Sequence, residues 1–252
     1  MLLTILICTV AAFVAGFIDA IAGGGGLITM PALLLTGVPP HMALGTGKLS
    51  AFLGSGVALL NFARSGLVLW RAAAVGVGFS LLGSYFGTLA ALRMDSALLG
   101  KVLVALLPLG MAATLLPRRE RRERHAVPEG ARLWILTPLV CFLVGMYDGF
   151  FGPGTGSFLI IAFHYVLCMR LLAASATAKV LNLASNFGSL LTFLWSGKVW
   201  FALGLPMAAG SIAGNWLGSR MAIRAGGEAV RRFLGISLGL LFATLAYQYF
   251  IR

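Results

Sequence analysis

The sequence predicts an all-α polytopic membrane protein built from two tandem repeats. Of its 252 residues, 60% are hydrophobic and 10% are charged, whereas a soluble domain carries about 25% charged residues. The apolar residues form repeated stretches of about 20, the length that crosses a bilayer as a helix. The order of motifs in the first half of the chain returns in the second half, and this return predicts the repeats.

Ten apolar segments can be placed, four long and one short in each repeat. The first repeat, 1–116, holds segments 2–21, 27–35, 42–62, 67–92 and 97–116. The second repeat, 132–252, holds segments 133–151, 158–167, 171–195, 199–223 and 229–250. Between them lies a basic linker loop, 117–131, which is predicted to be cytoplasmic because positive loops mark that side of a membrane.

The first segment resembles a signal peptide, because an apolar run ends in Ala20-Ile21-Ala22. It lacks the positively charged region that begins a signal peptide. It also matches the start of the second repeat, and a removable signal would not be duplicated inside the chain. We therefore expect segment 2–21 to be a membrane helix.

The two short segments follow glycine-rich breaks and are too short to cross a bilayer as straight helices. Irregular backbone survives at membrane depth only inside the protein or beside a wet cavity. Short, glycine-interrupted segments at corresponding places of two halves indicate the binding site of a secondary transporter. The breaks are therefore the first candidates for a site.

Each half carries one lysine inside an apolar helix, Lys48 and Lys179, and the two stand 131 residues apart. Thr46 and Thr177 precede them by two residues. A lysine at the centre of a membrane helix costs roughly 2.5–3.5 kcal/mol on insertion scales. Snorkelling, or a structural pair with an aspartate, would explain one such lysine, but the duplication favours substrate binding.

The second lysine helix has one polar face. Ser175, Lys179, Asn182 and Asn186 follow at spacings of four, three and four, so they share a side of the helix. The face could make interhelical hydrogen bonds, but a cavity lining is favoured. In the first half only Ser55 continues the face from Lys48, so the site could be lopsided.

The glycine breaks would place backbone N–H groups at the starts of the two short helices, where anions bind. The alternative role is a flexible turn or close helix packing. Two lysines together with two such helix ends suit a small, compact anion. The residues concerned are Gly24, Gly25, Gly26, Gly154, Thr155 and Gly156.

Two aspartates, Asp19 and Asp148, are duplicated as well. Each could carry a proton that couples transport, could neutralise a lysine when substrate is absent, or could be a buried salt-bridge partner or helix cap. Two glycine pairs at a spacing of four, Gly83 with Gly87 and Gly214 with Gly218, predict helix-packing faces.

The distribution of basic residues favours inverted repeats. If each short segment crosses the membrane, the halves are inverted, and 13 Lys and Arg fall inside against 4 outside. If the short segments are re-entrant, the halves are parallel and the count is 10 against 7. The positive-inside rule prefers the first arrangement, with both termini outside. Its inside residues are Arg64, Arg71, Arg118, Arg119, Arg121, Arg122, Arg124, Arg132, Arg170, Arg220, Arg224, Arg231 and Arg232, and its outside residues are Arg93, Lys101, Lys198 and Arg252.

Several other functions are not supported. The net charge of +12 comes largely from loop arginines, and no stretch is long enough for a soluble nucleic-acid-binding domain. The three cysteines have no metal-ligand spacing and indicate neither a disulfide framework nor a metal site. No cofactor motif and no catalytic constellation is found, so we expect no enzyme.

The chain resembles the sulfite exporter TauE/SafE family. The resemblance rests on the stretch from Gly16 to Gly26 with Pro31, on Gly45-Thr46-Gly47-Lys48, and on the echo of both in the second half. It covers nearly the whole chain. The second half departs from the pattern, with Phe150, Phe151 and Pro153 where the first half has Ile21, Ala22 and Gly24.

The resemblance implies a multi-pass carrier in the bacterial inner membrane that moves sulfite, sulfonates or related anions, often outward. Alternating access would move one repeat against the other around a midplane site. A membrane-embedded enzyme and a non-transporting scaffold are the alternatives. The expected partners are the bilayer and the small anion; the oligomeric state is open, with a homodimer as one alternative.

Overall fold

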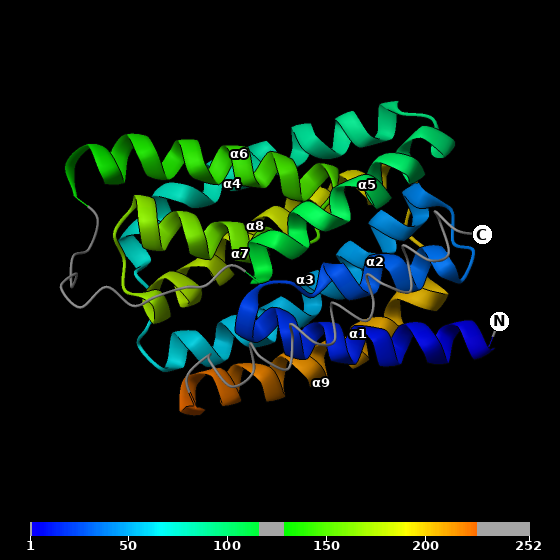
Figure 1. The fold of residues 1–252 in the computed structure, drawn as a ribbon, viewed down its shortest axis with the longest axis horizontal. Coiled ribbons are helices and arrows are strands. Elements are labelled where there is room, and N and C mark those ends of the chain that lie inside the picture. Colours follow the sequence, from blue (N-terminus) through cyan, green and yellow to red (C-terminus); the bar gives the residue numbers. More distant parts are fainter. Residues whose placement is uncertain (1, 116–128, 226–252) are drawn as a thin grey trace.

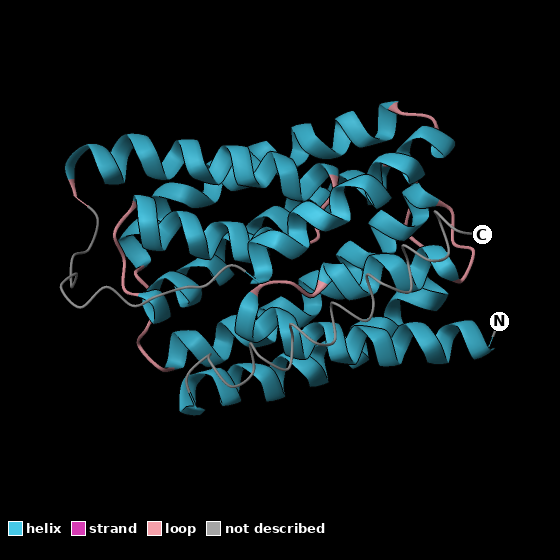
Figure 2. Ribbon diagram, in the orientation of Figure 1, coloured by secondary structure: helices cyan, strands magenta, loops and turns pink. Residues whose placement is uncertain are grey.

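The computed structural model describes residues 2–115 and 129–225, and every element in these ranges is a helix (Figures 1 and 2). Most of the predicted linker loop 117–131 lies outside the described residues. The same holds for the predicted last segment, 229–250. The all-helical prediction is confirmed for the part of the chain that is described.

The first half forms four long helices and one short one, close to the predicted bounds. They are α1 (Leu2–Ala22), α2 (Gly26–Leu35), α3 (Pro40–Arg64), α4 (Trp70–Arg93) and α5 (Ser96–Leu115). Gly23, Gly37 and Gly66 separate successive helices and have positive φ angles. Because glycine adopts this conformation without a steric penalty, these positions let the chain turn directly after a helix.

The second half follows the same order as far as it is described. A π-helical turn (Arg132–Leu136) runs into α6 (Thr137–Phe150), and α7 (Thr155–Ile161) runs into a second π-helical turn (Ala162–Val166). The remaining helices are α8 (Leu171–Trp195) and α9 (Phe201–Ala225). The predicted short segment 158–167 therefore begins three residues earlier and is only partly α-helical.

By length and apolar composition, four helices of the described ranges could cross a membrane. They are Leu2–Ala22, Pro40–Arg64, Trp70–Arg93 and the continuous helix Arg132–Phe150. Large apolar side chains on these helices point outward, among them Leu6, Phe86 and Leu143, which are at least half exposed. A soluble protein would bury most of these side chains, whereas a bilayer solvates them. The chain is therefore a multi-pass membrane protein.

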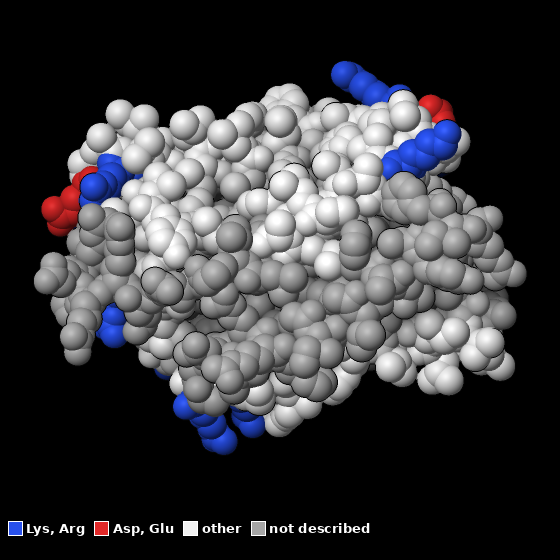
Figure 3. All heavy atoms as spheres, viewed as in Figure 1, with Lys and Arg blue, Asp and Glu red and all other residues white. Residues whose placement is uncertain are grey.

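Helices α1 and α6 run in opposite directions. In Figure 1, α1 begins at the right-hand end, next to the N label, whereas α6 begins at the left-hand end. Helices α3 and α9 end at the left, with Arg64 and Arg224 in their last turns. The visible Lys and Arg side chains lie toward the two ends of the view, and the described residues that show between them are uncharged (Figure 3).

The two glycine pairs form close helix contacts, as predicted. A Cβ atom on Gly214 or Gly218 of α9 would lie within 2.3 Å of the carbonyl oxygen of Phe13 or Phe17 on α1. Side chains at these two positions would therefore push the helices apart. In the same way, Gly83 and Gly87 of α4 lie against the backbone of α6, at Phe142 and Met146.

The breaks after α1 and α6 meet in the interior. A Cβ atom on Gly23 would lie 2.4 Å from the carbonyl carbon of Gly156, so the two backbones touch. Ser157 fixes the contact, because its N–H donates to the Gly23 carbonyl (3.3 Å) and its hydroxyl donates to the Ala22 carbonyl (2.6 Å). The two irregular segments therefore satisfy part of each other's hydrogen bonding at membrane depth.

Candidate functional site

Two buried ion pairs lie on either side of this contact. Lys48 Nζ on α3 lies 2.8 Å from Asp148 Oδ2 on α6. Lys179 Nζ on α8 lies 2.8 Å from Asp19 Oδ2 on α1. Each lysine thus pairs with the aspartate of the opposite half. The lysine–aspartate pairing left open by the sequence is present twice.

Both pairs are withdrawn from the surface. Lys48, Lys179 and Asp148 are at most 5% exposed, and the Asp19 side chain is 16% exposed. A charge in an apolar interior is tolerated when it is paired, and removing one partner is strongly destabilising. The pairing therefore explains how the helices tolerate their lysines, and leaves open which lysine also serves a ligand.

A cavity of about 70 Å³ distinguishes the two lysines. It lies among the ends of α1 and α6, the start of α2, and helices α3, α8 and α9. Lys48, Asp19 and Asp148 line it, whereas Lys179 does not. The polar side chains that complete its lining are Thr29, Ser50, Ser55, Thr155, Asn182, Asn186, Ser211 and Asn215.

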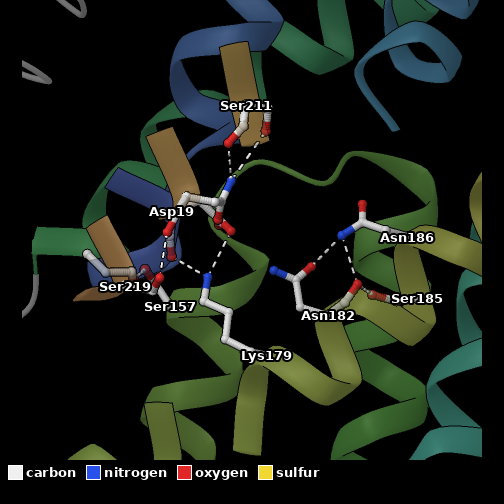
Figure 4. Close-up of polar contacts among 10 residues, drawn as sticks. Asp19, Ser157, Lys179, Asn182, Ser185, Asn186, Ser211 and Ser219 are labelled. Carbon is white, nitrogen blue, oxygen red and sulfur yellow. Dashed lines mark hydrogen bonds and ion pairs between the residues drawn. The ribbon is translucent and has the colours of Figure 1, made fainter. Parts of the chain in front are cut away.

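Lys179 is held by a second contact that Lys48 lacks. Its ammonium group donates to the backbone carbonyl of Asp19 as well as to the carboxylate. Figure 4 shows the Lys179 side chain pointing at Asp19, with Asn182 on its other side. Both contacts turn the ammonium group toward the end of α1, and the side chain is 1% exposed.

The two asparagines of the predicted polar face line the cavity beside Lys48. The amide nitrogen of Asn186 donates to the backbone carbonyl and the side-chain oxygen of Asn182, both at 2.7 Å. These bonds assign nitrogen and oxygen in the Asn186 side chain. The side-chain nitrogen of Asn182 is then directed away from Asn186 (Figure 4). Of that face, Ser175 and Lys179 are absent from the cavity lining.

Helix α9 contributes two lining residues that the sequence reasoning missed, Ser211 and Asn215. The Asn215 side-chain nitrogen donates to the Ser211 carbonyl at 3.0 Å. Its side-chain oxygen and the Ser50 hydroxyl are buried and have no hydrogen-bond partner among the described residues. The spacing of four from Ser211 to Asn215 and Ser219 was a usable signal, since it predicts a polar face on α9.

The first glycine break supplies backbone donors. Gly25 and Gly26 line the cavity, whereas Gly24 does not. The N–H groups of all three donate to no acceptor within residues 2–115 and 129–225. Gly26 begins α2, Gly25 is its N-cap and Gly24 precedes the cap, so these N–H groups lie at a helix start, where the helix dipole attracts negative charge.

The second break differs. Gly154 has φ +86° and lies against Gly110, outside the cavity. Thr155 and Gly156 line the cavity, but the Thr155 N–H already donates to the Gly152 carbonyl at 3.1 Å. Helix α7 has seven α-helical residues. The expected match between the two helix starts is therefore incomplete, because α7 is shorter and its donors are partly used.

The threonines beside the lysines are fully buried and do not line the cavity. The Thr46 hydroxyl accepts a hydrogen bond from the Trp200 N–H, and the Thr177 hydroxyl accepts one from the Leu69 N–H, both at 3.0 Å. Trp200 and Leu69 immediately precede α9 and α4. The structure thus gives both threonines the task of holding the start of a helix from the other half.

The described residues contain no group of three or more His, Cys, Asp or Glu side chains that could hold a metal ion. The chemistry of the cavity is therefore one ammonium group, two carboxylates, amides, hydroxyls and backbone N–H groups.

Comparison with known proteins gives the family. Residues 8–245 match the family described as "Sulfite exporter TauE/SafE". A Haemophilus influenzae protein named "Probable membrane transporter protein" is 42% identical over 98% of this chain and 95% of its own length. "Probable membrane transporter protein YfcA" of Escherichia coli K12 is 36% identical over 94% of this chain and 87% of its own.

A more distant relative, "Probable membrane transporter protein YdhB" of Bacillus subtilis, is 23% identical over 87% of this chain and 89% of its own. No solved structure matches the chain. The family match spans both ion pairs, both glycine breaks and every helix that lines the cavity. The chain therefore belongs to the sulfite exporter TauE/SafE family of membrane transporters.

Proposed function

We propose that the protein is an anion carrier of the bacterial inner membrane that exports sulfite or an organosulfonate by alternating access. The single observation that carries the proposal is Lys48, a buried ammonium group on the wall of a cavity in the interior. An ionisable residue inside a membrane protein marks a substrate or ion pathway by default. The family and the names of its relatives support transport as the activity.

The cavity carries the groups that an oxyanion needs. Lys48 supplies a compact positive charge, the unused N–H groups of Gly25 and Gly26 supply the field of a helix start, and Asn182 supplies an amide. About 70 Å³ of space open to the centre of a water-sized sphere, several times what one water molecule needs, accommodates a small anion. Met30, Leu44 and Phe151 add an apolar wall against which a short organic tail could lie.

The proposed architecture is two inverted repeats, residues 1–116 and 132–252. Reciprocal contacts support it: the two threonine bonds and the two ion pairs each join equivalent places in opposite halves. The opposite directions of α1 and α6 support it as well. The end of the molecule that carries Arg64, Arg132 and Arg224 would face the cytoplasm, together with the basic loop 117–131.

Alternating access would use the region where the two halves contact each other. The ion pairs and the Gly23–Gly156 contact join the two repeats at the level of the cavity. Rocking two rigid bodies about this level would open the cavity first to one side and then to the other. Each of the helix pairs α1–α9 and α4–α6 locks glycine of one repeat against backbone of the other, so each moving body would contain helices from both repeats.

Two other functions are less well supported. A membrane-embedded enzyme would need a nucleophile and a base in contact, and the described lining of the cavity holds no cysteine or histidine. A scaffold without transport would have no use for a charged cavity. Flux of labelled sulfite in proteoliposomes distinguishes carrier, enzyme and scaffold.

The direct test replaces Lys48. Losing one charged hydrogen bond costs about 1.5–3 kcal/mol, so Lys48→Ala should bind the anion roughly tenfold to a hundredfold more weakly. Lys48→Arg should impair binding as well, because a planar guanidinium needs a differently shaped cavity. Binding is measured with purified protein, and thermal melting shows whether the variants are folded.

The matched control is Lys179→Ala, which removes the lysine that does not line the cavity. Its folded fraction should keep an affinity close to that of the wild type. Unchanged affinity in Lys48→Ala would exclude the proposed site. Equal losses of affinity in both lysine variants would mean that the anion contacts the lysines of both halves.

A further inference from the structure

We propose that Asp148 is the internal counter-ion that the anion replaces on Lys48, and that Asp148 takes up one proton when it is displaced. Asp19 stays paired with Lys179 throughout. This inference rests on the proposed anion-carrier function. It assigns the coupling proton, for which the sequence offered both aspartates, to one of them.

The exchange follows from the position of the Lys48–Asp148 pair on the wall of the cavity. Both side chains line the cavity, so an anion inside it competes with Asp148 for the same ammonium group. Asp148 is 2% exposed, and its Oδ2 atom makes no hydrogen bond with the described residues besides the ion pair. Once the anion holds Lys48, this carboxylate oxygen is buried without a partner.

A buried carboxylate without a partner is stabilised by protonation, because desolvation disfavours the charged form. The groups around Asp148 offer no other positive charge. The polar side chains that α4 presents to α6 are hydroxyls, at Ser80, Ser84 and Thr88. On α6 itself, the Tyr147 hydroxyl donates to the Pro153 carbonyl at 2.7 Å. Lys179 on α8 is bound to Asp19.

Charge balance points the same way. The two lysines and two aspartates sum to zero, so a monovalent anion alone would leave one net negative charge in the interior. One proton from water, bound to the displaced Asp148 carboxylate, restores neutrality. No bond other than this O–H bond forms, and Lys48 keeps its proton and its charge.

Asp19 cannot play this part in the same way. Its partner Lys179 lies outside the cavity lining and holds both the carboxylate and the backbone carbonyl of Asp19. An anion in the cavity therefore cannot displace Asp19 from Lys179 without first breaking the hydrogen bond to the Asp19 backbone carbonyl near the end of α1.

The inference has a consequence for energetics. The carrier would move one monovalent anion together with one proton, so each turnover with such an anion would transfer no net charge. The membrane potential would then not drive the anion outward, and the direction of flux would follow the anion gradient and the pH gradient.

The test uses ethanesulfonate, whose charge does not change near neutral pH, and the purified full-length protein. Calorimetric titration in two buffers with different ionisation enthalpies gives the number of protons taken up per anion bound. We expect one proton for the wild type and one for Asp19→Asn. Because binding takes up a proton, affinity should fall up to tenfold for each unit that pH rises.

Asp148→Asn should take up no proton. It should also bind at least about tenfold more tightly at alkaline pH, since the competing carboxylate is gone. Proton uptake that persists in Asp148→Asn, or that disappears only in Asp19→Asn, would overturn the assignment.

A spectroscopic measurement on the wild type avoids dependence on variants that do not fold. Infrared difference spectra should show a protonated carboxyl band when ethanesulfonate is added, and no such band would overturn the inference. Binding without proton uptake would overturn the inference alone. Failure of the wild type to bind ethanesulfonate and sulfite would overturn the carrier function and the inference with it.

Discussion

The two lysine–aspartate pairs have the same separation between their charged atoms but different surroundings. Lys48 and Asp148 both line the cavity, whereas of the second pair only Asp19 lines it, and Lys179 lies outside the lining with an additional backbone contact. A duplicated sequence has thus produced one lysine on the cavity wall and one away from it. Duplication of a residue therefore indicates that a contact is repeated. It does not by itself indicate that a function is repeated.

The neighbouring helices explain the difference. Ser211 and Asn215 of α9 line the cavity near the end of α1. Their counterparts 131 residues earlier, Ser80 and Ser84 of α4, pack into helix contacts instead: the Ser80 hydroxyl donates to the Leu181 carbonyl at 2.8 Å. The amides and the cavity lie on one side of the crossing, while the opposite side is filled.

The largest expected effect is on stability, and it separates the structural pair from the binding pair. Lys179→Ala leaves Asp19 without its partner and removes two contacts, so the free energy of unfolding should fall by about 3–5 kcal/mol. Chemical denaturation in detergent measures the change. A second substitution in the same chain, Asp19→Asn, should recover much of the loss by removing the unpaired charge.

If Lys179→Ala were as stable as the wild type while its anion affinity collapsed, the roles assigned to the two pairs would have to be exchanged. Parallel measurement of melting and of binding on the same preparation makes that outcome visible.

A smaller effect on stability, similar at the two positions, is expected for the two threonines. Thr46→Val and Thr177→Val each leave one buried backbone N–H, of Trp200 or Leu69, without its acceptor. Each should cost about 1–3 kcal/mol of stability. Because neither hydroxyl lines the cavity, anion affinity should stay unchanged; weaker binding in either variant would return that threonine to the substrate site, where the sequence had placed it.

The smallest effect concerns the amides of the cavity. A neutral hydrogen bond contributes about 0.5–1.5 kcal/mol, so Asn182→Ala should weaken anion binding by roughly twofold to tenfold. Ser185→Ala is the matched control, since Ser185 is buried on the same helix and does not line the cavity. A loss of affinity in the serine variant equal to that in Asn182→Ala would mean that both act through packing of α8.

Most of the fold could be predicted from the sequence, because apolar segments and glycine breaks are local signals. Segment 171–195 coincides with α8, and the other described helices lie within a few residues of their predicted bounds. The glycine pairs on α4 and α9 were also identified as packing faces, since close helix contacts need residues without side chains.

The site could be predicted only in part. The polar face of α8 was readable from its spacing, but which of its residues meet the cavity depends on the crossing of helices from opposite halves. The positions of Thr46 and Thr177 beside the lysines suggested that they bind a ligand. Their hydroxyls instead accept hydrogen bonds from backbone N–H groups far along the chain. Asn215 lies in α9, far along the chain from either lysine, and only the packing of α9 on α1 and α3 brings it to the cavity.

That packing of α1 against α9 also constrains how the protein can be made. Helix α1 leaves the ribosome before α9 and locks its backbone onto the glycines of α9, and the chain between them takes roughly 10 to 40 seconds to synthesise at bacterial rates of about 5–20 residues per second. Throughout that interval α1 must wait in the bilayer with its contact face covered by lipid or by an assembly factor. Neither half can finish folding before the other exists, so a chain interrupted after its basic loop would be a substrate for membrane proteases rather than a half-sized transporter.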